Sequence, residues 1–287
     1  YKEIRIMKKG LKKLAALGLV AVMALGMVAC GKKDAGANSS QTALAKIQAN
    51  KKLVLGTSPD YPPFEFLVSE GGKGNVVGAD IELAKKLAEK MGVELEIKTI
   101  DFDALIPALQ SGKVDVVITG MSPTEERKKN IDFSDIYFQG KNGVIVKKGD
   151  AGKYKTEDDL KKAKLGVQKG STQETYIKDT LKVTGYKGLT AVPDLVMDLK
   201  NGNVDAIVLN DKVAGINATK YDGVEIVKDI KMTSAGEEEA MAIAVKKGDN
   251  KDLIELMNKV IKDLNASGEY DKILADAVEL VGKQDKK

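Results

Sequence analysis

Histidine is absent from the 287-residue sequence, and cysteine occurs once, at Cys30. Without histidine the chain cannot build a Ser-His-Asp or Cys-His nucleophilic site, or use histidine as an acid or base. The usual zinc ligands are missing for the same reason, since a single cysteine cannot supply a site. Carboxylate and lysine chemistry remain open. We therefore expect no metal site, no cofactor and no catalytic residue, and an enzyme is the less favoured interpretation.

Arginine is also scarce. Lysine and arginine together number 46, yet arginine occurs only as Arg5 and Arg127. A planar guanidinium can hold a carboxylate through two parallel hydrogen bonds, which lysine cannot copy. Arg127 is therefore a candidate for a carboxylate-binding site. The alternative is a solvated arginine on a helix surface.

The first thirty residues have a composition of their own. A basic cluster at residues 8–13 precedes sixteen uncharged, mostly apolar residues, 14–29, as in a secretory signal. The run is marginal in length for a membrane-spanning helix, which is the alternative. It ends in Met27-Val28-Ala29-Cys30, which resembles the lipobox of bacterial lipoproteins except at Met27, where leucine is usual. We predict a signal sequence at 1–29, lipidation of Cys30, a lipid-anchored linker over 30–42, and a location on the outer face of the cytoplasmic membrane.

Removal of this segment changes the charge of the chain. Residues 1–29 carry six basic side chains and one acidic one, so the net charge of +4 becomes about −1 without them. The basic balance therefore belongs to the leader and not to a nucleic-acid-binding surface. We expect no nucleic-acid partner.

Short β-branched runs and amphipathic stretches alternate after residue 42. They predict strands at 53–57, 94–99 and 114–119, and helices at 43–50, 80–91 and 102–111. Such alternation is typical of an α/β fold with a largely parallel sheet covered by helices.

An internal sequence repeat indicates two such units. The pattern of residues 105–118, a helix, a glycine and a buried strand, recurs ninety residues later at 195–208. This period is too long for a solenoid and favours two similar lobes. The extended segments 136–146 and 239–245 are predicted to cross between them. Lobe 1 then takes residues 43–138 plus 239–287 and lobe 2 takes 143–235, with a ligand cleft where the carboxyl ends of their strands meet.

Two predicted helix starts could bind an anion. Ser122, Pro123 and Glu125 predict a capping box, with Arg127 one turn further on. Residues 171–174 repeat the Ser-x-x-Glu pattern in the second lobe, where backbone N–H groups would be free. Helix capping alone would also explain both patterns.

Several motifs together resemble those of periplasmic-type solute-binding proteins for polar amino acids: GTSPDYPPFEF (56–66), GADIEL (78–83) and FDALIPAL (102–109). Residues 120–127, 133–134, 170–173 and 210–211 continue the resemblance in order along almost the whole mature chain. The resemblance implies a two-lobed clamp, each lobe a mostly parallel sheet with flanking helices, joined by two crossover strands. Such a clamp captures a free polar amino acid and docks on the permease and ATPase subunits of an ABC importer. We expect a monomer tethered to the membrane by its lipid.

The resemblance also implies roles for individual residues. Arg127 would hold the α-carboxylate of the ligand, helped by backbone groups of Ser122 and Thr172. Asp211 would take the α-ammonium, together with the carbonyl of Gly120 and the hydroxyl of Ser122. An anion site and a cation site a few ångströms apart are what a zwitterion requires.

The side-chain specificity is left open. Tyr61 and Phe102 would sandwich the ligand side chain, although both could equally be core residues. Ser58 stands where binders of basic amino acids or glutamine often carry aspartate. Polar residues that could act in its place are Asp60, Glu65, Gln168 and Gln173. Glutamine, arginine, lysine and cystine all remain candidate ligands.

Three alternatives remain. A dehydratase acting on a cyclic carboxylate is known on this scaffold, and would need an acid or base beside the carboxylate site; Lys169 and Glu174 are the nearest candidates. A ligand-sensing domain would normally be joined to a spanning helix and a signalling module. Surface adhesion is a third role that no residue argues against.

Overall fold

The computed structural model describes residues 42–70, 73–233 and 238–284. The predicted signal sequence, Cys30 and all but the last residue of the linker lie outside the described residues. Within the described ranges, no helix has both the length and the apolar character needed to cross a bilayer.

The first lobe is built on parallel strands, as predicted. β1 (Lys52–Thr57) lies between β5 (Glu94–Thr99) and β6 (Val116–Val117), and is parallel to both. α1 (Ala43–Asn50) and α2 (Ala79–Met91) confirm two predicted helices. The helix predicted at 102–111 begins as a 3-10 turn, η1 (Phe102–Ala104), before α3 (Leu105–Gln110). α2 buries Ile81, Leu87 and their neighbours at helical spacing, so its apolar face fixes it against the sheet.

The second lobe repeats this arrangement. β8 (Leu165–Gln168) lies between β10 (Ala206–Asn210) and β9 (Lys187–Leu189), all parallel. α7 (Val192–Asn201) ends at Gly202 just as α3 is followed by Gly112, with φ of 80° and 75°. Both turns need a left-handed residue, which explains why the glycine recurs in the repeat. Among the described residues between β6 and β12, the other helices are α4 (Glu125–Lys128), η2 (Ala151–Lys153), α5 (Glu157–Leu160), α6 (Thr172–Thr175), η3 (Tyr176–Thr180) and α8 (Asp211–Lys220).

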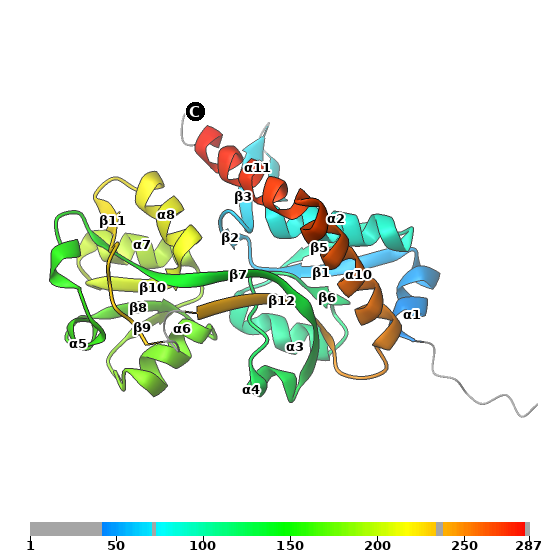
Figure 1. Cartoon of the computed structure of the whole chain (residues 1–287), viewed down its shortest axis with the longest axis horizontal. Coiled ribbons are helices and arrows are strands. Elements are labelled where there is room, and N and C mark those ends of the chain that lie inside the picture. Colours follow the sequence, from blue (N-terminus) through cyan, green and yellow to red (C-terminus); the bar gives the residue numbers. More distant parts are fainter. Residues whose placement is uncertain (1–41, 71–72, 234–237, 285–287) are drawn as a thin grey trace, which may run out of the picture. The chain divides into compact units, whose positions relative to one another are not determined.

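Two antiparallel strands join the lobes. β7 (Ile131–Lys147) pairs with β12 (Glu238–Lys246) along its first part and with β10 and β11 (Val224–Ile226) along its last part. β12 also pairs with β6, so both groups of strands connect into the order β5-β1-β6-β12-β7-β10-β8-β9. Figure 1 shows β7 and β12 side by side between the two groups. The predicted two-lobed α/β architecture with two crossing strands is confirmed.

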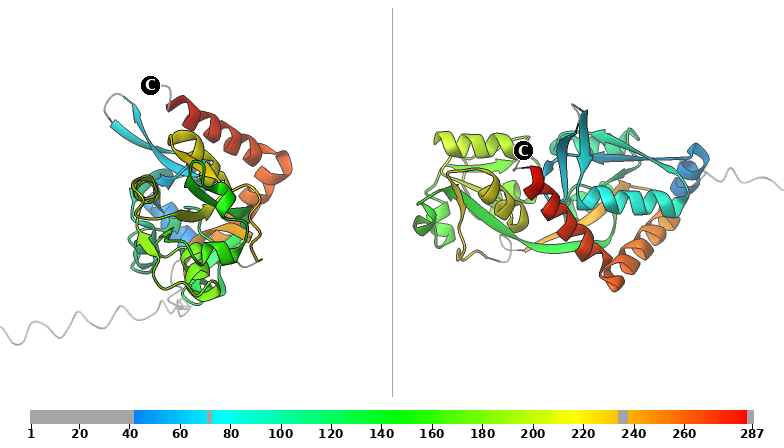
Figure 2. Two further views of the ribbon diagram at one scale, coloured as in Figure 1. Left: turned by 90° about the vertical axis from the view of Figure 1, so that its left-hand side faces the viewer. Right: turned by 90° about the horizontal axis from the view of Figure 1, so that it is seen from above.

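A small antiparallel sheet was not predicted. It consists of β2 (Asp60–Tyr61), β3 (Glu65–Glu70) and β4 (Lys73–Val77), and Figure 2 shows its β3–β4 hairpin projecting from the first lobe. Two helices follow β12 near the C-terminus, α10 (Lys251–Ser267) and α11 (Glu269–Gln284). Phe66 and Val68 of the hairpin pack with Val281 of α11. The turn between β2 and β3 places Asp60, Tyr61 and Glu65 at the cleft.

Candidate functional site

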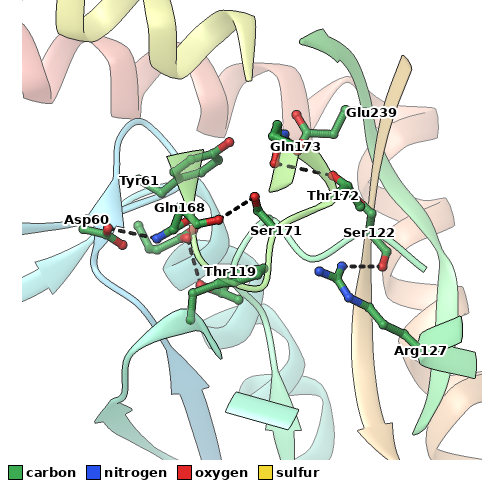
Figure 3. A pocket seen from close by; sticks show the side chains of 13 residues that line it. Asp60, Tyr61, Thr119, Ser122, Arg127, Gln168, Ser171, Thr172, Gln173 and Glu239 are labelled. Atoms are coloured by element: carbon green, nitrogen blue, oxygen red, sulfur yellow. Dashed lines mark hydrogen bonds between the residues drawn. The ribbon is translucent and has the colours of Figure 1, made fainter. Parts of the chain in front are cut away.

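One pocket lies where the two lobes and the crossing strands meet. Its lining residues are Asp60, Tyr61, Glu65, Phe102, Thr119, Gly120, Ser122, Arg127, Gln168, Ser171, Thr172, Gln173 and Glu239. The cavity itself is only about 10 Å³, room for roughly one water molecule, because side chains of both lobes contact each other directly. In Figure 3, Asp60, Tyr61 and Gln168 lie on one side of it and Arg127 and Ser122 on the other.

Most of the predicted ligand-binding residues line this pocket. They are Gly120, Ser122, Arg127, Thr172, Tyr61, Phe102 and Gln168. Ser58 and Asp211 do not line it. The structure thus brings an arginine, two aromatic rings and the residues that begin α6 together across a sequence span of more than one hundred residues.

The helix that carries Arg127 starts later than predicted. Its N-cap is Thr124, whose Oγ1 accepts a hydrogen bond from the Arg127 N–H at 3.2 Å, so the predicted capping box on Ser122 is wrong. The carbonyl of Ser122 is engaged instead by the Thr124 N–H and by the Arg127 side chain. The second predicted start is confirmed: Ser171 caps α6 by accepting from the Glu174 N–H at 3.1 Å.

The guanidinium of Arg127 is held on three sides. Nη1 donates to the carbonyl of Ser122 and Nη2 to that of Gly170, both at 2.8 Å. The guanidinium carbon lies 5.6 Å from the centre of the Phe102 ring, a cation–π distance. Desolvation lowers the pKa of Arg127 to about 10, against the opposing charges of Glu239 and Glu126. The group therefore stays positive at neutral pH and is oriented by backbone rather than by a paired carboxylate.

The two aromatic residues have partners of their own. Tyr61 accepts a hydrogen bond at its hydroxyl from the backbone N–H of Asn210 at 3.0 Å, which links β2 to β10. Phe102 packs against the guanidinium of Arg127. Both rings are buried and border the cavity.

Asp60 forms a polar cluster between the lobes. Its Oδ2 accepts from Gln168 Nε2 at 3.0 Å and from the Val192 N–H at 2.8 Å, while Oδ1 accepts from Ser58 Oγ at 2.9 Å. Burial raises the pKa of Asp60, and these hydrogen bonds lower it. Ser58 does not line the pocket, but it contacts two residues that do: its hydroxyl donates to Asp60, and its N–H donates to Thr119 Oγ1 at 3.0 Å.

Glu239 is a pocket residue that the sequence argument missed. Its Oε2 accepts from Asn210 Nδ2 at 2.6 Å and its Oε1 from Gln173 Nε2 at 3.0 Å. Desolvation raises its pKa to about 7; Asp211 raises it further, and the two amides and Arg127 oppose the shift. Asp211 itself begins α8, and its Oδ1 is buried without a hydrogen-bond partner among the described residues. The sequence offered one indication of this role: Glu239 is an acidic residue at the start of the segment predicted to cross between the lobes.

Glu65 and Thr119 form the remaining polar lining. Glu65 Oε1 accepts from Thr119 Oγ1 at 2.9 Å. The next residue, Gly120, has φ of 58°, and a Cβ there would lie 3.4 Å from the Tyr61 ring and from Met241. The left-handed conformation and the nearby side chains thus favour glycine at this position.

The two candidate acid–base residues of the enzymatic alternative lie outside the pocket lining. Neither Lys169 nor Glu174 lines the pocket. The Glu174 carboxylate accepts from the Gly170 N–H at 2.7 Å and from the Tyr186 hydroxyl at 3.1 Å, so it stabilises the turn before α6. In the part of the chain that the structure describes, no cluster of acidic, cysteine or histidine side chains could hold a metal ion.

Comparisons with known proteins agree with this geometry. The profile of the bacterial extracellular solute-binding proteins, family 3, matches residues 53–277. The arginine-binding extracellular protein ArtP of Bacillus subtilis is 39% identical over 92% of this chain and 96% of its own length. The structure of an amino acid ABC transporter substrate-binding protein, AbpA, from Streptococcus pneumoniae bound to L-arginine superposes with a TM-score of 0.78 at 41% identity, over 82% of this chain and 98% of that one.

Two further matches are named for another ligand or for an evolutionary link to an enzyme. A probable histidine-binding protein of Campylobacter jejuni is 35% identical over 92% of this chain and 98% of its own length. An ancestral amino-acid-binding protein described as a precursor of cyclohexadienyl dehydratase is 33% identical, with a TM-score of 0.74 over 83% of this chain and all of that one. With a profile that spans most of the chain and relatives of this identity, the protein belongs to family 3 of the bacterial extracellular solute-binding proteins.

Proposed function

We propose that this protein is the substrate-binding component of an ABC importer and captures a free L-amino acid with a cationic side chain, arginine foremost. One observation carries the choice of ligand: the pocket between the lobes is lined by a single guanidinium, Arg127, and by three carboxyl groups, Asp60, Glu65 and Glu239. A zwitterion alone would need only one group of each sign. The surplus of acidic groups favours a ligand that brings a second positive charge.

The proposed roles follow from position. Arg127 receives the α-carboxylate, with backbone groups of Ser122 and Thr172. Asp211 was expected to receive the α-ammonium, and Glu239 is better placed to do so because it borders the cavity. Asp60 lies on the far side from Arg127, where a guanidinium or ammonium at the end of a side chain would lie (Figure 3). Glu65, which pairs with Tyr61 between β2 and β3, also lines the pocket. Relatives named for arginine support this choice.

Capture requires the cleft to open. The direct contacts between the lobes leave far less room than a free amino acid occupies, so we propose that β7 and β12 bend to admit it. The proposed moving units are residues 43–138 plus 239–287 and residues 143–235. Closure over the ligand would then present the surface that docks on the permease.

Location and assembly are part of the proposal. A secretory signal at 1–29 and a lipidated Cys30 would tether a monomer to the outer face of the membrane through the linker 30–42. Family membership and the transporter proteins among its relatives support export and an ABC partner.

Calorimetric titration of refolded, ligand-free protein tests the ligand class. We expect arginine to bind most tightly, then lysine and ornithine, with glutamine, histidine and cystine weaker. At about 100 times its dissociation constant, arginine should stabilise the protein by about 2.7 kcal/mol and raise the Tm by about 5–10 °C. A preference for glutamine would overturn the cationic class, and no response to any amino acid would overturn the function.

Chromatography of the ligand after prolonged incubation tests the enzymatic alternative. We expect the amino acid to be recovered unchanged. Its conversion would favour a dehydratase-like activity, and incubation with Lys169→Ala and Glu174→Ala variants would then locate the acid or base.

A further inference from the structure

Two carboxyl groups are buried together beneath the pocket. Glu65 on β3 is 1% exposed and Asp80 on α2 is fully buried. Consecutive residues hold one oxygen of each: Thr119 Oγ1 donates to Glu65 Oε1, and the Gly120 N–H donates to Asp80 Oδ2, both at 2.9 Å. The Tyr137 hydroxyl donates to the same Asp80 oxygen at 2.7 Å. The two carboxyl groups therefore lie side by side, and Glu65 also borders the ligand cavity.

The second oxygen of each group has no donor. Glu65 Oε2 and Asp80 Oδ1 are buried without a hydrogen-bond partner among the described residues. Neither carboxyl group is paired with a lysine or arginine in that part of the chain. Two adjacent buried carboxylates cannot both keep their charge at low energetic cost, whereas one proton between them removes a charge and supplies a donor.

The pKa values of the two carboxyl groups and of their neighbours also favour one proton on the pair. Burial and the neighbouring Asp80 raise the pKa of Glu65 well above its usual range, and burial raises that of Asp80 to about 6. The hydroxyls nearby remain neutral, since the pKa values of Tyr61, Tyr137 and Tyr270 are all raised. The charged or titratable groups that face the pair or its pocket are Asp60 on β2, Tyr61 on β2, Tyr137 on β7, Tyr270 on α11, Arg127 on α4 and Glu239 on β12.

We propose that Glu65 and Asp80 share one proton in the ligand-free protein and that a cationic ligand side chain releases it on reaching Glu65. This inference rests on the proposed function and couples ligand binding to the release of a proton. A guanidinium or ammonium against Glu65 provides the positive charge that allows the second carboxyl group to ionise. The proton leaves to solvent, so the pair gains one negative charge as the ligand brings one positive charge.

The pair then distinguishes ligands by charge. Binding of arginine releases about one proton, and its affinity rises by up to about tenfold per pH unit over the range in which the free protein holds the proton and the complex does not. A neutral ligand such as glutamine leaves the proton in place, and its affinity does not follow this pH dependence.

Calorimetry in buffers of different ionisation enthalpy measures the proton directly. At roughly pH 6 the α-ammonium of either ligand can also discharge a proton from Glu239, so we expect the wild-type protein to release about one more proton per arginine bound than per glutamine. In Glu65→Gln, which keeps the shape, arginine should release no more protons than glutamine and should bind at least about tenfold more weakly. Circular dichroism checks that the variant is folded.

Two variants locate the source of the proton. Glu239→Gln removes a second pocket carboxyl whose pKa is raised and should retain the excess of protons released by arginine over glutamine, as should Glu125→Gln on the exposed surface. An excess of arginine over glutamine that persists in Glu65→Gln, or that is lost only in Glu239→Gln, overturns the assignment.

Infrared difference spectra test the shared proton on the wild-type protein alone. Addition of arginine should remove a protonated-carboxyl band, and an unchanged band would refute the proposal. The outcomes also separate the two proposals: arginine binding without proton release overturns only the shared proton, whereas absence of arginine binding overturns the proposed function.

Discussion

Arg127 and Gly170 are joined across the cleft, with Arg127 Nη2 donating to the Gly170 carbonyl at 2.8 Å. Gly170 immediately precedes the Ser171 cap of α6 in the second lobe, while Arg127 belongs to α4 in the first. The other terminal nitrogen, Nη1, donates to the Ser122 carbonyl. Both contacts use neutral carbonyl oxygens. A ligand carboxylate would compete well for this guanidinium, because a hydrogen bond between two charged groups is stronger.

Arg127→Lys is expected to weaken amino-acid binding by about 30- to 1000-fold, equivalent to about 2–4 kcal/mol. Lysine keeps the charge but offers a compact ammonium in place of two parallel donors, so the carboxylate is left partly unpaired in a closed cleft. The N-cap Thr124 is untouched, so α4 should persist. Titration calorimetry with arginine measures the loss.

Lys128→Gln is the matched control for that variant. Lys128 lies next to Arg127 on the same turn, but it is exposed and pairs with Glu125 at the surface. Its substitution should leave the affinity nearly unchanged. Wild-type affinity in Arg127→Lys would show that Arg127 does not bind the ligand.

Asp60→Ala is expected to favour the open form of the ligand-free protein. Its carboxylate accepts hydrogen bonds from Gln168 and from the Val192 N–H, both in the second lobe. Alanine removes these contacts and exposes the first turn of α7 to water on opening. Small-angle scattering should therefore show a larger radius of gyration without ligand.

The Asp60→Ala experiment needs a control acid away from the cleft. Asp179 is exposed on η3, so Asp179→Ala should leave the scattering curve unchanged. If Asp60→Ala also scatters like the wild type, Asp60 does not hold the lobes together. Saturating arginine should restore the compact form of Asp60→Ala if ligand contacts can replace the lost ones.

Local pattern predicted the regular elements well because their burial is periodic. α2 and β5 were placed within a residue, since a buried stripe and a β-branched run leave little ambiguity. The strand expected at 114–119 is assigned only over Val116–Val117, yet Asp115 and Ile118 still donate to Val54 and Gly56 of β1. The β2–β4 sheet was missed because its prolines and glycines indicate turns and its strands carry no clear alternation.

The site was only partly predictable for a physical reason. The family resemblance pointed to Arg127 and the aromatic residues, but Glu65 and Glu239 are 174 positions apart and line one pocket only when the chain has folded. The helix start at Thr124 shows the same limit. Ser122 and Thr124 are both good caps by sequence, and a side-chain contact from Arg127 to the Ser122 carbonyl is part of what distinguishes them in the structure.

Cys30→Ser is expected to release the protein from the membrane fraction. A lipidated cysteine would carry more than one acyl chain, enough for stable anchoring, and serine cannot form the thioether. Fractionation and immunoblotting measure the shift, with Ser39→Ala in the same linker as the control. Membrane association that survives Cys30→Ser would instead support an uncleaved helix at residues 14–29.

Glu239→Gln is expected to change how stability depends on pH. Burial raises the pKa of Glu239 from 4.5 to about 7 in the folded protein, so the folded state holds a proton that the unfolded state has lost. The stability linked to this proton is fully present below about pH 4.5 and is lost as the pH rises through about 7. This pKa shift corresponds to a pH-dependent contribution to folding stability on the order of 3 kcal/mol. Glutamine does not ionise, so the variant lacks this pH dependence.

The free energy of unfolding of the wild type, measured relative to Glu239→Gln, should therefore fall between about pH 4.5 and about pH 8. Denaturant titrations followed by circular dichroism at both ends of this range measure the difference. Glu125→Gln is the control: Glu125 is exposed, and Lys128 lowers its pKa, so any change should be small and of opposite sign. Parallel curves for wild type and Glu239→Gln would show that Glu239 ionises normally, and the hydrogen bonds from Asn210 and Gln173 would then be strong enough to offset its burial.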